Sequence, residues 1–436
     1  YVRPGTSQGN GSAESPFIRV QDAIRKAKDY DIIVLADGIY RGYGNTGFYT
    51  QGKPIMITST GLVERCVIDG EQRATCVSVT AGEDLRTVIY GLTLINGRSY
   101  RGGGFTCSST SPQIRNCRIS HCSSTGRGGG ASLQNSMAQI LQCSFLSNES
   151  AQGGGLAIYG GSPIIENCVM GHNNAKVQGG AVYVDGSSKC VIRHCTLAAN
   201  TAGQGGGFCS RYANPSFENS IVWGNAPNGF EFWSGSNTVQ NCLLQDPWTS
   251  YGTNNISGNP GFVALQESNF RLAAETSPCI GAAQRDLATS RDADGEQRDA
   301  GAADIGADEY YDTNADGFLD FWTKRYLGNT ETTVSPTNDP DGDGYANVRE
   351  HAWVTDPTGE TFADSDTLPD EWEFCYLHDL SHDEQGDYDR DHISNLDEFK
   401  QKTRPDAALD SDGDRIAHDW ERFSFTDIPA CTPNTR

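Results

Sequence analysis

The stretch DPDGDGYANVRE, residues 339–350, places oxygen-bearing side chains at regular intervals. Carboxylates occupy its first, third and fifth positions, a glycine the sixth, an amide the ninth and a glutamate the twelfth, namely Asp339, Asp341, Asp343, Gly344, Asn347 and Glu350. Calcium takes about six to eight hard oxygen ligands, and alternate carboxylates on a tight turn followed by a reaching glutamate supply them. The spacing therefore predicts a calcium loop.

The same spacing recurs at intervals of about 23 to 27 residues along the last part of the chain. One further intact copy is DYDRDHISNLDE, with Asp387, Asp389, Asp391, Asn395 and Glu398. Another is DSDGDRIAHDWE, with Asp410, Asp412, Asp414 and Glu421, in which His418 takes the ninth position. Two copies are partial: DTNADGFLDFWT keeps Asp312, Asn314, Asp316 and Asp320 but ends on Thr323, and ADSDTLPDEWE keeps Asp364, Asp366, Asp370 and Glu373 but lacks the first ligand. We expect calcium as the cofactor of this module.

Net charge separates this part of the chain from the rest. Of the 56 Asp and Glu residues, 33 lie between 301 and 436, against 10 of the 33 Lys and Arg residues, which gives 10 − 33 = −23. The first 300 residues carry 23 charges of each sign. An acidic run is by default a solvated or disordered tail, but the loop spacing favours bound cations here. The negative charge also argues against nucleic acid as a partner, because it would repel phosphate.

Short segments with two or three aromatic or aliphatic residues separate the loops, for example DFWTKRYLG at 320–328 and NVREHAWV at 347–354. We expect them to form short helices that share a small core. The alternation of Trp-bearing and Asn-bearing loops resembles thrombospondin type-3 repeats and the EF-hand-like loops of dockerins. A dockerin implies a cohesin partner and uses two loops in one compact module. Five loops in series favour a calcium-braced stalk or end module instead.

The middle of the chain repeats itself about every 26 residues. A glycine pair or triplet followed by an alternating apolar run begins at each of Gly102, Gly128, Gly153, Gly179 and Gly205. A second column of the repeat consists of the asparagines Asn148, Asn173, Asn200 and Asn225. Self-similarity at such a period indicates a solenoid, in which each unit buries its apolar face against the next unit.

Each unit contains short runs of alternating apolar residues and no helical stripe, so we expect strands separated by turns. Without a helix to form a crossover, the chain must coil on itself with one turn per unit. This predicts an all-β parallel β-helix of about nine coils. The repeated glycines then mark corners with positive φ, and the asparagine columns predict side-chain ladders between coils.

The prediction divides the chain into an N-terminal cap, a β-helix with a C-terminal closure and a calcium module, at residues 1–30, 31–310 and 311–436. The cap is expected to contain an amphipathic helix within residues 15–31. The stretches SPCIGAA (277–283) and DIGADEY (304–310) are expected to close the second end of the β-helix, because open strand edges invite aggregation.

The repeats also carry a family resemblance. The GGA[ILV] and FxxN pair, here residues 179–182 and 145–148, resembles the repeats of polymorphic outer-membrane adhesins. The N-terminal cap together with the SPCIGAA and DIGADEY stretches looks like that of secreted right-handed β-helix proteins of environmental bacteria. The resemblance covers roughly residues 1–310 and implies a right-handed β-helix. Its motifs specify a fold rather than an activity.

Cysteine usage and the calcium loops bear on the compartment. Fourteen cysteines, no initiating Met and no apolar run of transmembrane length suggest an exported protein, extracellular or at the cell surface after removal of a signal peptide. The cysteines of one repeat column are Cys117, Cys143, Cys168, Cys195 and Cys242. Parallel Cβ vectors disfavour disulfides between stacked residues, so we expect buried free thiols there. Cys375 and Cys431 are the better candidates for a disulfide.

Two classes of function follow. One is a calcium-stabilised structural or adhesive protein that self-associates into filaments or binds other surface proteins or carbohydrate. The alternative is a polysaccharide lyase or glycoside hydrolase, which needs several acids and a base in one groove. The candidate groups stand at scattered repeat positions, so no catalytic residue is predicted: Glu149, Glu166, Asp185, Glu218, Lys176, Lys189, Arg193 and Arg211. Late aromatic residues offer a carbohydrate platform, a subunit contact or a packing surface: Trp223, Phe230, Phe232, Trp233, Trp248 and Tyr251.

Overall fold

The computed structural model divides the chain into two compact units, Tyr1–Thr333 and Val334–Arg436. It describes residues 1–5, 9–246, 252–274, 276–284, 290–299, 301–342, 345–359, 368, 373, 377, 384–388 and 393–401. The first of the predicted calcium loops, which begins at Asp312, therefore belongs to the same compact unit as the β-helix.

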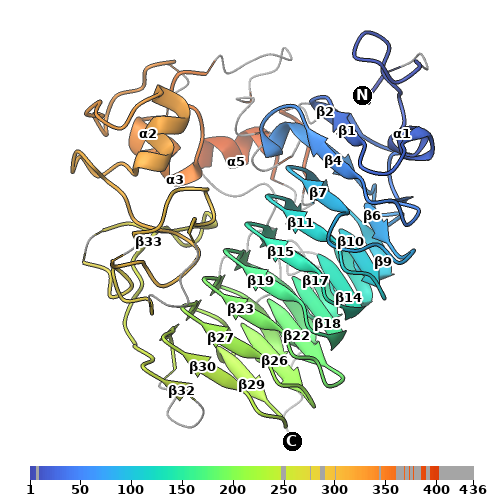
Figure 1. The fold of residues 1–436 in the computed structure, drawn as a ribbon. Helices are drawn as coiled ribbons and strands as arrows, with labels where there is room; N and C mark the ends of the chain where they lie inside the picture. Colours follow the sequence, from blue (N-terminus) through green and yellow to red (C-terminus); the bar gives the residue numbers. More distant parts are fainter. Residues whose placement is uncertain are drawn as a thin grey trace, which may run out of the picture. The chain divides into compact units, whose positions relative to one another are not determined.

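One repeat of the first unit forms one coil of four short strands. These are β11 (Gln113–Arg115), β12 (Arg118–Ser120), β13 (Ser123–Arg127) and β14 (Ala131–Ser136). The next strand, β15 (Gln139–Leu141), lies beside β11 and pairs with it in parallel, residue for residue. The chain thus winds through four stacked parallel sheets, which makes it a parallel β-helix, as the repeats predict (Figure 1).

The four sheets are named in the order in which a coil crosses them. Sheet 1 contains β1 (Ile32–Leu35), β4 (Met56–Ser59), β7 (Val88–Tyr90), β11, β15, β19 (Ile164–Glu166), β23 (Val191–Arg193), β27 (Ser216–Glu218), β30 (Thr238–Gln240) and β32 (Gly252–Thr253). Sheet 2 contains β2 (Gly38–Tyr40), β5 (Cys66–Asp69), β8 (Thr93–Ile95), β12, β16 (Ser144–Leu146), β20 (Val169–Gly171), β24 (Thr196–Ala198), β28 (Ile221–Trp223) and β31 (Leu243–Leu244). Sheet 3 contains β9 (Arg98–Arg101), β13, β17 (Glu149–Gln152), β21 (Asn174–Gln178) and β25 (Thr201–Gln204). Sheet 4 contains β3 (Phe48–Tyr49), β6 (Val77–Val79), β10 (Phe105–Ser108), β14, β18 (Leu156–Gly161), β22 (Val182–Asp185), β26 (Phe208–Arg211) and β29 (Phe230–Phe232).

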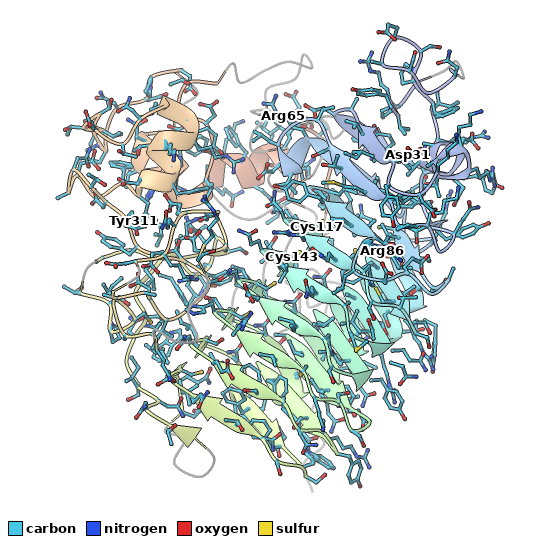
Figure 2. The ribbon with its side chains drawn as sticks, in the orientation of Figure 1. Asp31, Arg65, Arg86, Cys117, Cys143 and Tyr311 are labelled. Carbon is cyan, nitrogen blue, oxygen red and sulfur yellow. The ribbon has the colours of Figure 1, made fainter. Side chains whose placement is uncertain are left out.

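Columns of like side chains fill the interior of the β-helix. Ile114, Ile140 and Ile165 stack on successive coils of sheet 1, all of them fully buried. The cysteine column lies in the same interior, where Cys117 and Cys143 are neighbours (Figure 2). The described cysteines are all free and buried, as predicted for the column, whereas Cys375 and Cys431 lie outside the described residues.

The predicted asparagine ladder is present at the corner between sheets 2 and 3. The side-chain amide of Asn148 donates to Asn173 Oδ1 at 3.0 Å. Asn173 in turn donates to Asn200, and Asn200 to Asn225, at 2.9 Å each. The ladder satisfies the polar groups of this buried corner on the coils from Asn148 to Asn225, which permits the chain to turn there without losing hydrogen bonds.

Glycines occupy the corner between sheets 3 and 4 because the backbone conformation there disfavours residues with a side chain. Gly128 and Gly153 both have φ of +68°. A Cβ atom on Gly153 would also clash with the carbonyl oxygen of Leu156. Both positive φ and the close approach of backbone favour a residue without a side chain.

The N-terminal cap contains a shorter helix than predicted. Helix α1 spans Val20–Lys26 and buries Val20, Ala23 and Ile24. It begins later than the amphipathic pattern because Phe17 is extended and forms a parallel bridge with Val2. Val2 also bridges to Leu35 of β1, so the N-terminus covers the first coil directly. A short 3-10 helix, η1 (Val63–Arg65), precedes β5.

The closing segment, residues 252–333, corrects one expectation. SPCIGAA and DIGADEY lie along the flank of the β-helix, where both pack against sheet 2, and Gly306 N of DIGADEY donates to Asn219 O at the turn between sheets 1 and 2, at 2.9 Å. The backbone of this segment accepts hydrogen bonds from side chains of three turns between sheets 1 and 2. Asn219 Nδ2 donates to Gln284 O at 3.1 Å, Asn167 Nδ2 to Arg291 O at 2.7 Å, and Gln142 Nε2 to Asp292 O at 2.7 Å. It therefore runs back toward the first coils.

Apolar packing explains this path. Ile221 and Leu243 occupy outward positions on sheet 2, and they pack against Leu272, Cys279 and Ile305 of the closing segment. The segment also contains the antiparallel hairpin of β33 (Phe262–Ala264) and β34 (Asn269–Leu272) and then helix α2 (Asp320–Leu327). Arg325 of α2 pairs with Glu64 of η1 at 3.1 Å, which fixes the helix beside the early coils.

The second unit contains the predicted short helices. Helix α3 spans Asn347–Trp353 and α5 spans Asn395–Gln401. Tyr345, Trp353, Leu368 and Leu377 form a small core, against which Phe399 packs. Within the described part of the chain, no helix is both long enough and apolar enough to span a membrane.

Candidate functional site

Three of the predicted calcium loops are closed in the same way. In each loop, the backbone N–H of the ninth residue donates to the carbonyl oxygen of the residue just before the first. These bonds are Asp320 N to Tyr311 O at 2.9 Å, Asn347 N to Asn338 O at 2.8 Å, and Asn395 N to Gly386 O at 2.7 Å. A shared closing bond in loops of different sequence indicates that the repeat spacing determines their backbone.

Each of these loops leads into a helix at the same point. Helices α2, α3 and α5 begin at Asp320, Asn347 and Asn395, the ninth residue of the respective loop. The twelfth residue then follows within the first turn and lies on the same helix face, because residues three apart are neighbours on a helix. The predicted ninth and twelfth ligands are therefore directed to one side of each helix.

The ninth and twelfth residues of the second unit are buried. Asn347 is 4% exposed and Glu350 is 1% exposed, while Asn395 and Glu398 have no exposed surface. Glu373, the twelfth residue of a loop that is described only in part, is also fully buried. Burial of a carboxylate is unfavourable unless positive charge or hydrogen bonds compensate it. A calcium ion held at this ligand spacing would supply such a positive charge.

In the loop that begins at Asp312, hydrogen bonds from the backbone orient the carboxylates. The carboxylate of Asp312 accepts hydrogen bonds from Asp316 N at 3.2 Å and Gly317 N at 3.0 Å. Gly317 has φ of +88°, a conformation that glycine adopts at no cost. Asp320 accepts hydrogen bonds from the backbone and the hydroxyl of Thr313. Thr323 takes the twelfth position, so this loop lacks the reaching carboxylate that the twelfth residues Glu350 and Glu398 provide in the other two loops.

The remaining predicted ligands are described only in part. Asp339 accepts a hydrogen bond from Gly342 N at 2.8 Å, which forms the tight turn at the start of its loop. Asp341 and Asp387 also lie in described segments. The other predicted ligands lie outside the described residues: Asp343, Asp364, Asp366, Asp370, Asp389, Asp391, Asp410, Asp412, Asp414 and Glu421.

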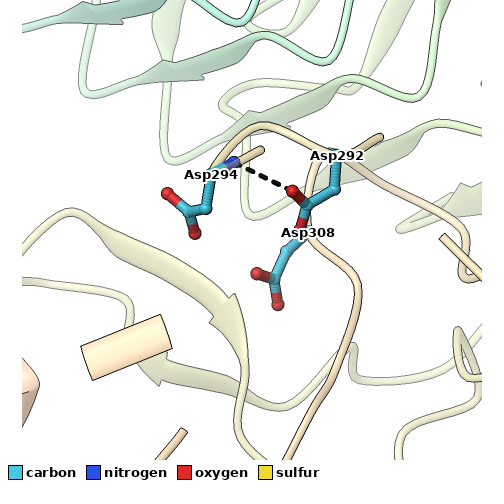
Figure 3. Close-up of side chains that lie close together, drawn as sticks. All are labelled: Asp292, Asp294 and Asp308. Atoms are coloured by element: carbon cyan, nitrogen blue, oxygen red, sulfur yellow. Dashed lines mark hydrogen bonds between the residues drawn. The ribbon is translucent and has the colours of Figure 1, made fainter. Parts of the chain in front are cut away.

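A cluster of aspartates that the sequence analysis missed lies in the closing segment (Figure 3). Asp292, Asp294 and Asp308 each place a carboxylate oxygen within 4.8 Å of the others. Asp294 N donates to Asp292 Oδ1 at 3.1 Å, and Arg271 holds both oxygens of Asp294, at 2.6 and 2.7 Å. The DADG stretch at 292–295 is the available signal, but Asp308 comes from the DIGADEY stretch and reaches the others only in the fold.

Burial controls the charge of this aspartate cluster. Burial, reinforced by the charge of Asp294, raises the pKa of Asp292 to about 7. Burial also raises the pKa of Asp308 well above its usual range and, with the charge of Asp292, raises that of Glu296 to about 8. At neutral pH the cluster therefore retains protons, and a cation could take their place.

A buried ion pair holds the closing segment against the β-helix. Arg298 Nη1 donates to Glu309 Oε2 at 3.0 Å, and Arg298 Nη2 donates to Asn167 Oδ1 at 3.1 Å. His194 lies in the same interface. Burial and, after it, the charge of Arg298 lower the pKa of His194 to about 3. His194 is therefore neutral and structural rather than a catalytic base exposed to solvent.

The acids and bases considered for catalysis bind their neighbours on the β-helix. Glu149 pairs with Lys176 at 3.0 Å, and Glu166 accepts from Arg193 Nε at 2.6 Å. Glu218 accepts from the hydroxyl of Ser216 at 2.8 Å. These contacts link positions on the same or adjacent coils. Among the described residues they do not gather the scattered acids into one group.

Comparison with known proteins agrees with the fold. A family model described as "Right handed beta helix region" matches residues 124–244. The first unit is a right-handed parallel β-helix. No curated protein matches the chain.

Solved structures with a similar fold include three enzymes. Pectate lyase Pel9A is 15% identical, with a TM-score of 0.46, over 71% of this chain and 95% of that one. An alginate lyase from Paenibacillus sp. str. FPU-7 is 17% identical, with a TM-score of 0.31, over 55% and 92% of the two chains. Pectin methylesterase from carrot is 12% identical, with a TM-score of 0.32, over 58% and 84%. Likenesses at this level do not bear on the activity of this chain.

Proposed function

We propose that this protein is an extracellular structural or adhesive protein in which calcium braces the loops that follow the β-helix. The observation that carries the proposal is the common construction of three loops, each closed by the same backbone hydrogen bond and each leading into a helix at its ninth residue. The β-helix would then present a long surface, and the calcium loops would hold an end module in its folded form.

The donor set suits calcium better than a transition metal. Carboxylate, amide and backbone oxygens are hard ligands, and the predicted ligand positions contain no thiol. Asp339, Asp341, Asn347 and Glu350 would hold one ion, and Asp387, Asn395 and Glu398 would contribute to another. The bound cation supplies no reaction here. It neutralises carboxylates that otherwise repel one another within a small core.

The charge of the second unit adds to this argument. Residues 334–436 contain 8 Lys and Arg against 26 Asp and Glu, which gives 8 − 26 = −18. Such self-repulsion opposes a compact state unless cations offset it. Calcium loops of extracellular modules bind at about 10⁻⁴ to 10⁻³ M, a concentration that is available outside the cell and not in the cytosol.

Calcium titration of the full chain by calorimetry tests the proposal. Asp341→Asn removes one predicted ligand charge and should weaken calcium binding at its loop by about tenfold, which corresponds to the loss of about 1.4 kcal/mol of binding free energy. Asp397→Asn is the matched control. Asp397 is exposed and stands between two ligand positions of another loop, so its loss should leave affinity unchanged. A parent chain that binds no calcium at millimolar concentration would contradict the proposal.

A second candidate is an enzyme that acts on polysaccharide, and one observation favours it. The hydroxyl of Tyr183 donates to Asp185 Oδ2 at 3.0 Å, and Asp185 pairs in register with Arg211 on the next coil. Burial and then the hydrogen bond to Asp185 raise the pKa of Tyr183, so its hydroxyl keeps its proton and orients the Asp185 carboxylate, the group that would serve as the base. Release of unsaturated or reducing ends from acidic polysaccharides, lost in Asp185→Asn, would establish this candidate.

A further inference from the structure

The outer face of sheet 4 carries a regular column of polar and aromatic side chains. Gln134 pairs in register with Tyr159, Tyr159 with Asp185, and Asp185 with Arg211. Trp233 extends the column, because its backbone N–H donates to Ser210 O at 3.1 Å on the neighbouring coil. Neighbouring strands lie about 4.8 Å apart, so the five side chains form a ladder with a step close to the length of one pyranose ring. We call this set the outer column.

Arginines hold several exposed aromatic rings on this face. The guanidinium of Arg127 lies 5.0 Å from the ring centre of Tyr159, which is 41% exposed. That of Arg211 lies 5.1 Å from the ring of Tyr212 and 5.7 Å from the ring of Trp233. Tyr212 is 60% exposed and Trp233 is 49% exposed. Cation–π contacts fix the orientation of these rings while leaving their other surface open to a ligand.

Sheets 3 and 4 together carry a small positive charge in a strongly negative chain. The strands of sheets 3 and 4 contain five basic residues against three acidic ones: Arg98, Arg101, Arg127, Lys176 and Arg211, against Glu149, Asp185 and Glu231. Their net charge is thus 5 − 3 = +2, whereas the whole chain carries −23. This local charge favours a negatively charged partner.

The arginines of this face remain available for carboxylates. Arg101 donates to Gln134 Oε1 at 2.9 Å, and Arg127 donates to Gln152 Oε1 at 3.1 Å. Both acceptors are neutral amides. Among the described residues, neither of these arginines nor Arg211 forms a salt bridge with a carboxylate. Arginine binds carboxylates with paired hydrogen bonds, so the residual capacity of these side chains suits an acidic ligand.

We propose that the outer column and its arginines bind a linear polysaccharide of uronic acids. Pyranose faces would lie on Tyr159 and Trp233, and carboxylates would meet Arg127 and Arg211. Gln134 and Asp185 would hydrogen-bond the sugar hydroxyls. The proposal gives the adhesive function a ligand and rests on that function, but it does not depend on the calcium loops, which the outer column does not include.

The test measures binding of short oligogalacturonates to the full chain, with methyl-esterified oligomers of equal length as the uncharged probe. Short oligomers avoid calcium-linked gels of the long polymer. The parent should bind the acidic oligomer more tightly, and added salt should weaken that binding. Trp233→Ala and the double variant Arg127→Gln with Arg211→Gln should each weaken it by about tenfold or more. Tyr90→Ala on sheet 1 is the control. Tyr90 is a partly exposed tyrosine like Tyr159, at 38% exposure, but it lies outside the outer column, so its loss should not change binding.

Three results would overturn the proposal. One is the absence of binding by the parent, and another is equal affinity for the charged and uncharged oligomers. The third is binding that chelator abolishes while Trp233→Ala and the arginine variant leave it intact, which would assign the polysaccharide to the calcium loops. Failure of calcium binding alone would remove the proposed calcium brace and leave the outer column unaffected, so the two proposals fail separately.

Discussion

Asp292 and Asp308 are two buried aspartates of the closing segment, and their protonation determines the local charge. Arg271 neutralises Asp294 but leaves the other two carboxylates close to it and to each other. Such an arrangement keeps protons on the carboxyl groups at a pH where exposed aspartates have lost them. The closing segment is therefore the part of the β-helix unit that should respond to pH.

The direction of that response follows from linkage. Asp292 has a pKa of about 7 in the folded chain against a usual value of 3.8, so the folded state binds this proton more tightly than the unfolded state. The stabilisation is complete below about pH 4 and is lost as pH rises through about 7. In metal-free buffer, the melting temperature of the β-helix unit should fall by a few degrees between pH 5 and 8.

Asp308→Asn should flatten this dependence, because it removes a neighbouring charge and one of the protonated groups. Asp29→Asn is the control, since Asp29 is exposed and remote from the cluster in sequence. The measurement is calorimetric melting across the pH range. A melting temperature that rises with pH in the parent, or an identical slope in Asp308→Asn, would contradict this account of the cluster.

At the scale of the secondary-structure elements, the asparagine ladder fixes the corner between sheets 2 and 3 on the coils from Asn148 to Asn225. Asn173 accepts from the side chain of Asn148 at 3.0 Å and from its backbone at 3.1 Å. It donates to Asn200 Oδ1 at 2.9 Å and to Phe145 O at 2.8 Å. Asn173→Ala leaves several buried groups unsatisfied and should lower the free energy of unfolding by about 3 kcal/mol.

Asn174→Ala provides the matched comparison for the ladder. Asn174 is the next residue, is exposed, and accepts one hydrogen bond from Thr201 at 3.2 Å. Its loss should change the unfolding free energy by about 0.5 kcal/mol or less. Denaturant unfolding of both variants decides the point. Equal effects would show that burial of the ladder does not stabilise the corner.

The elements that the sequence could predict are those that repeat at a regular interval along the chain. The glycine, cysteine and asparagine columns each mark a fixed point of the coil, so the repeat predicts strands, corners and interior. The closing segment has no such period. Its position depends on contacts such as Gln142 to Asp292, 150 residues apart in the chain, and these contacts place it on the flank rather than over the end. The aspartate cluster was missed for the same reason.

At the scale of the whole molecule, the two units differ both in the contacts that stabilise them and in their net charge. The β-helix is stabilised by stacked apolar columns and hydrogen-bonded corners, whereas the second unit has a small core around Tyr345 and Trp353 and a large negative charge. If calcium binds as proposed, a small core with that charge would gain much of its stability from the bound cations. Removal of calcium should therefore affect the two units very differently.

Limited proteolysis of the full chain, in calcium and in chelator, tests the central claim most directly. With calcium, both units should resist cleavage. In chelator, cleavage should spread through residues 334–436, because their carboxylates repel and their core is small, while the coils between Ile32 and Leu244 stay intact. Readdition of calcium should restore protection of the second unit. Equal resistance of the second unit with and without calcium would contradict the account.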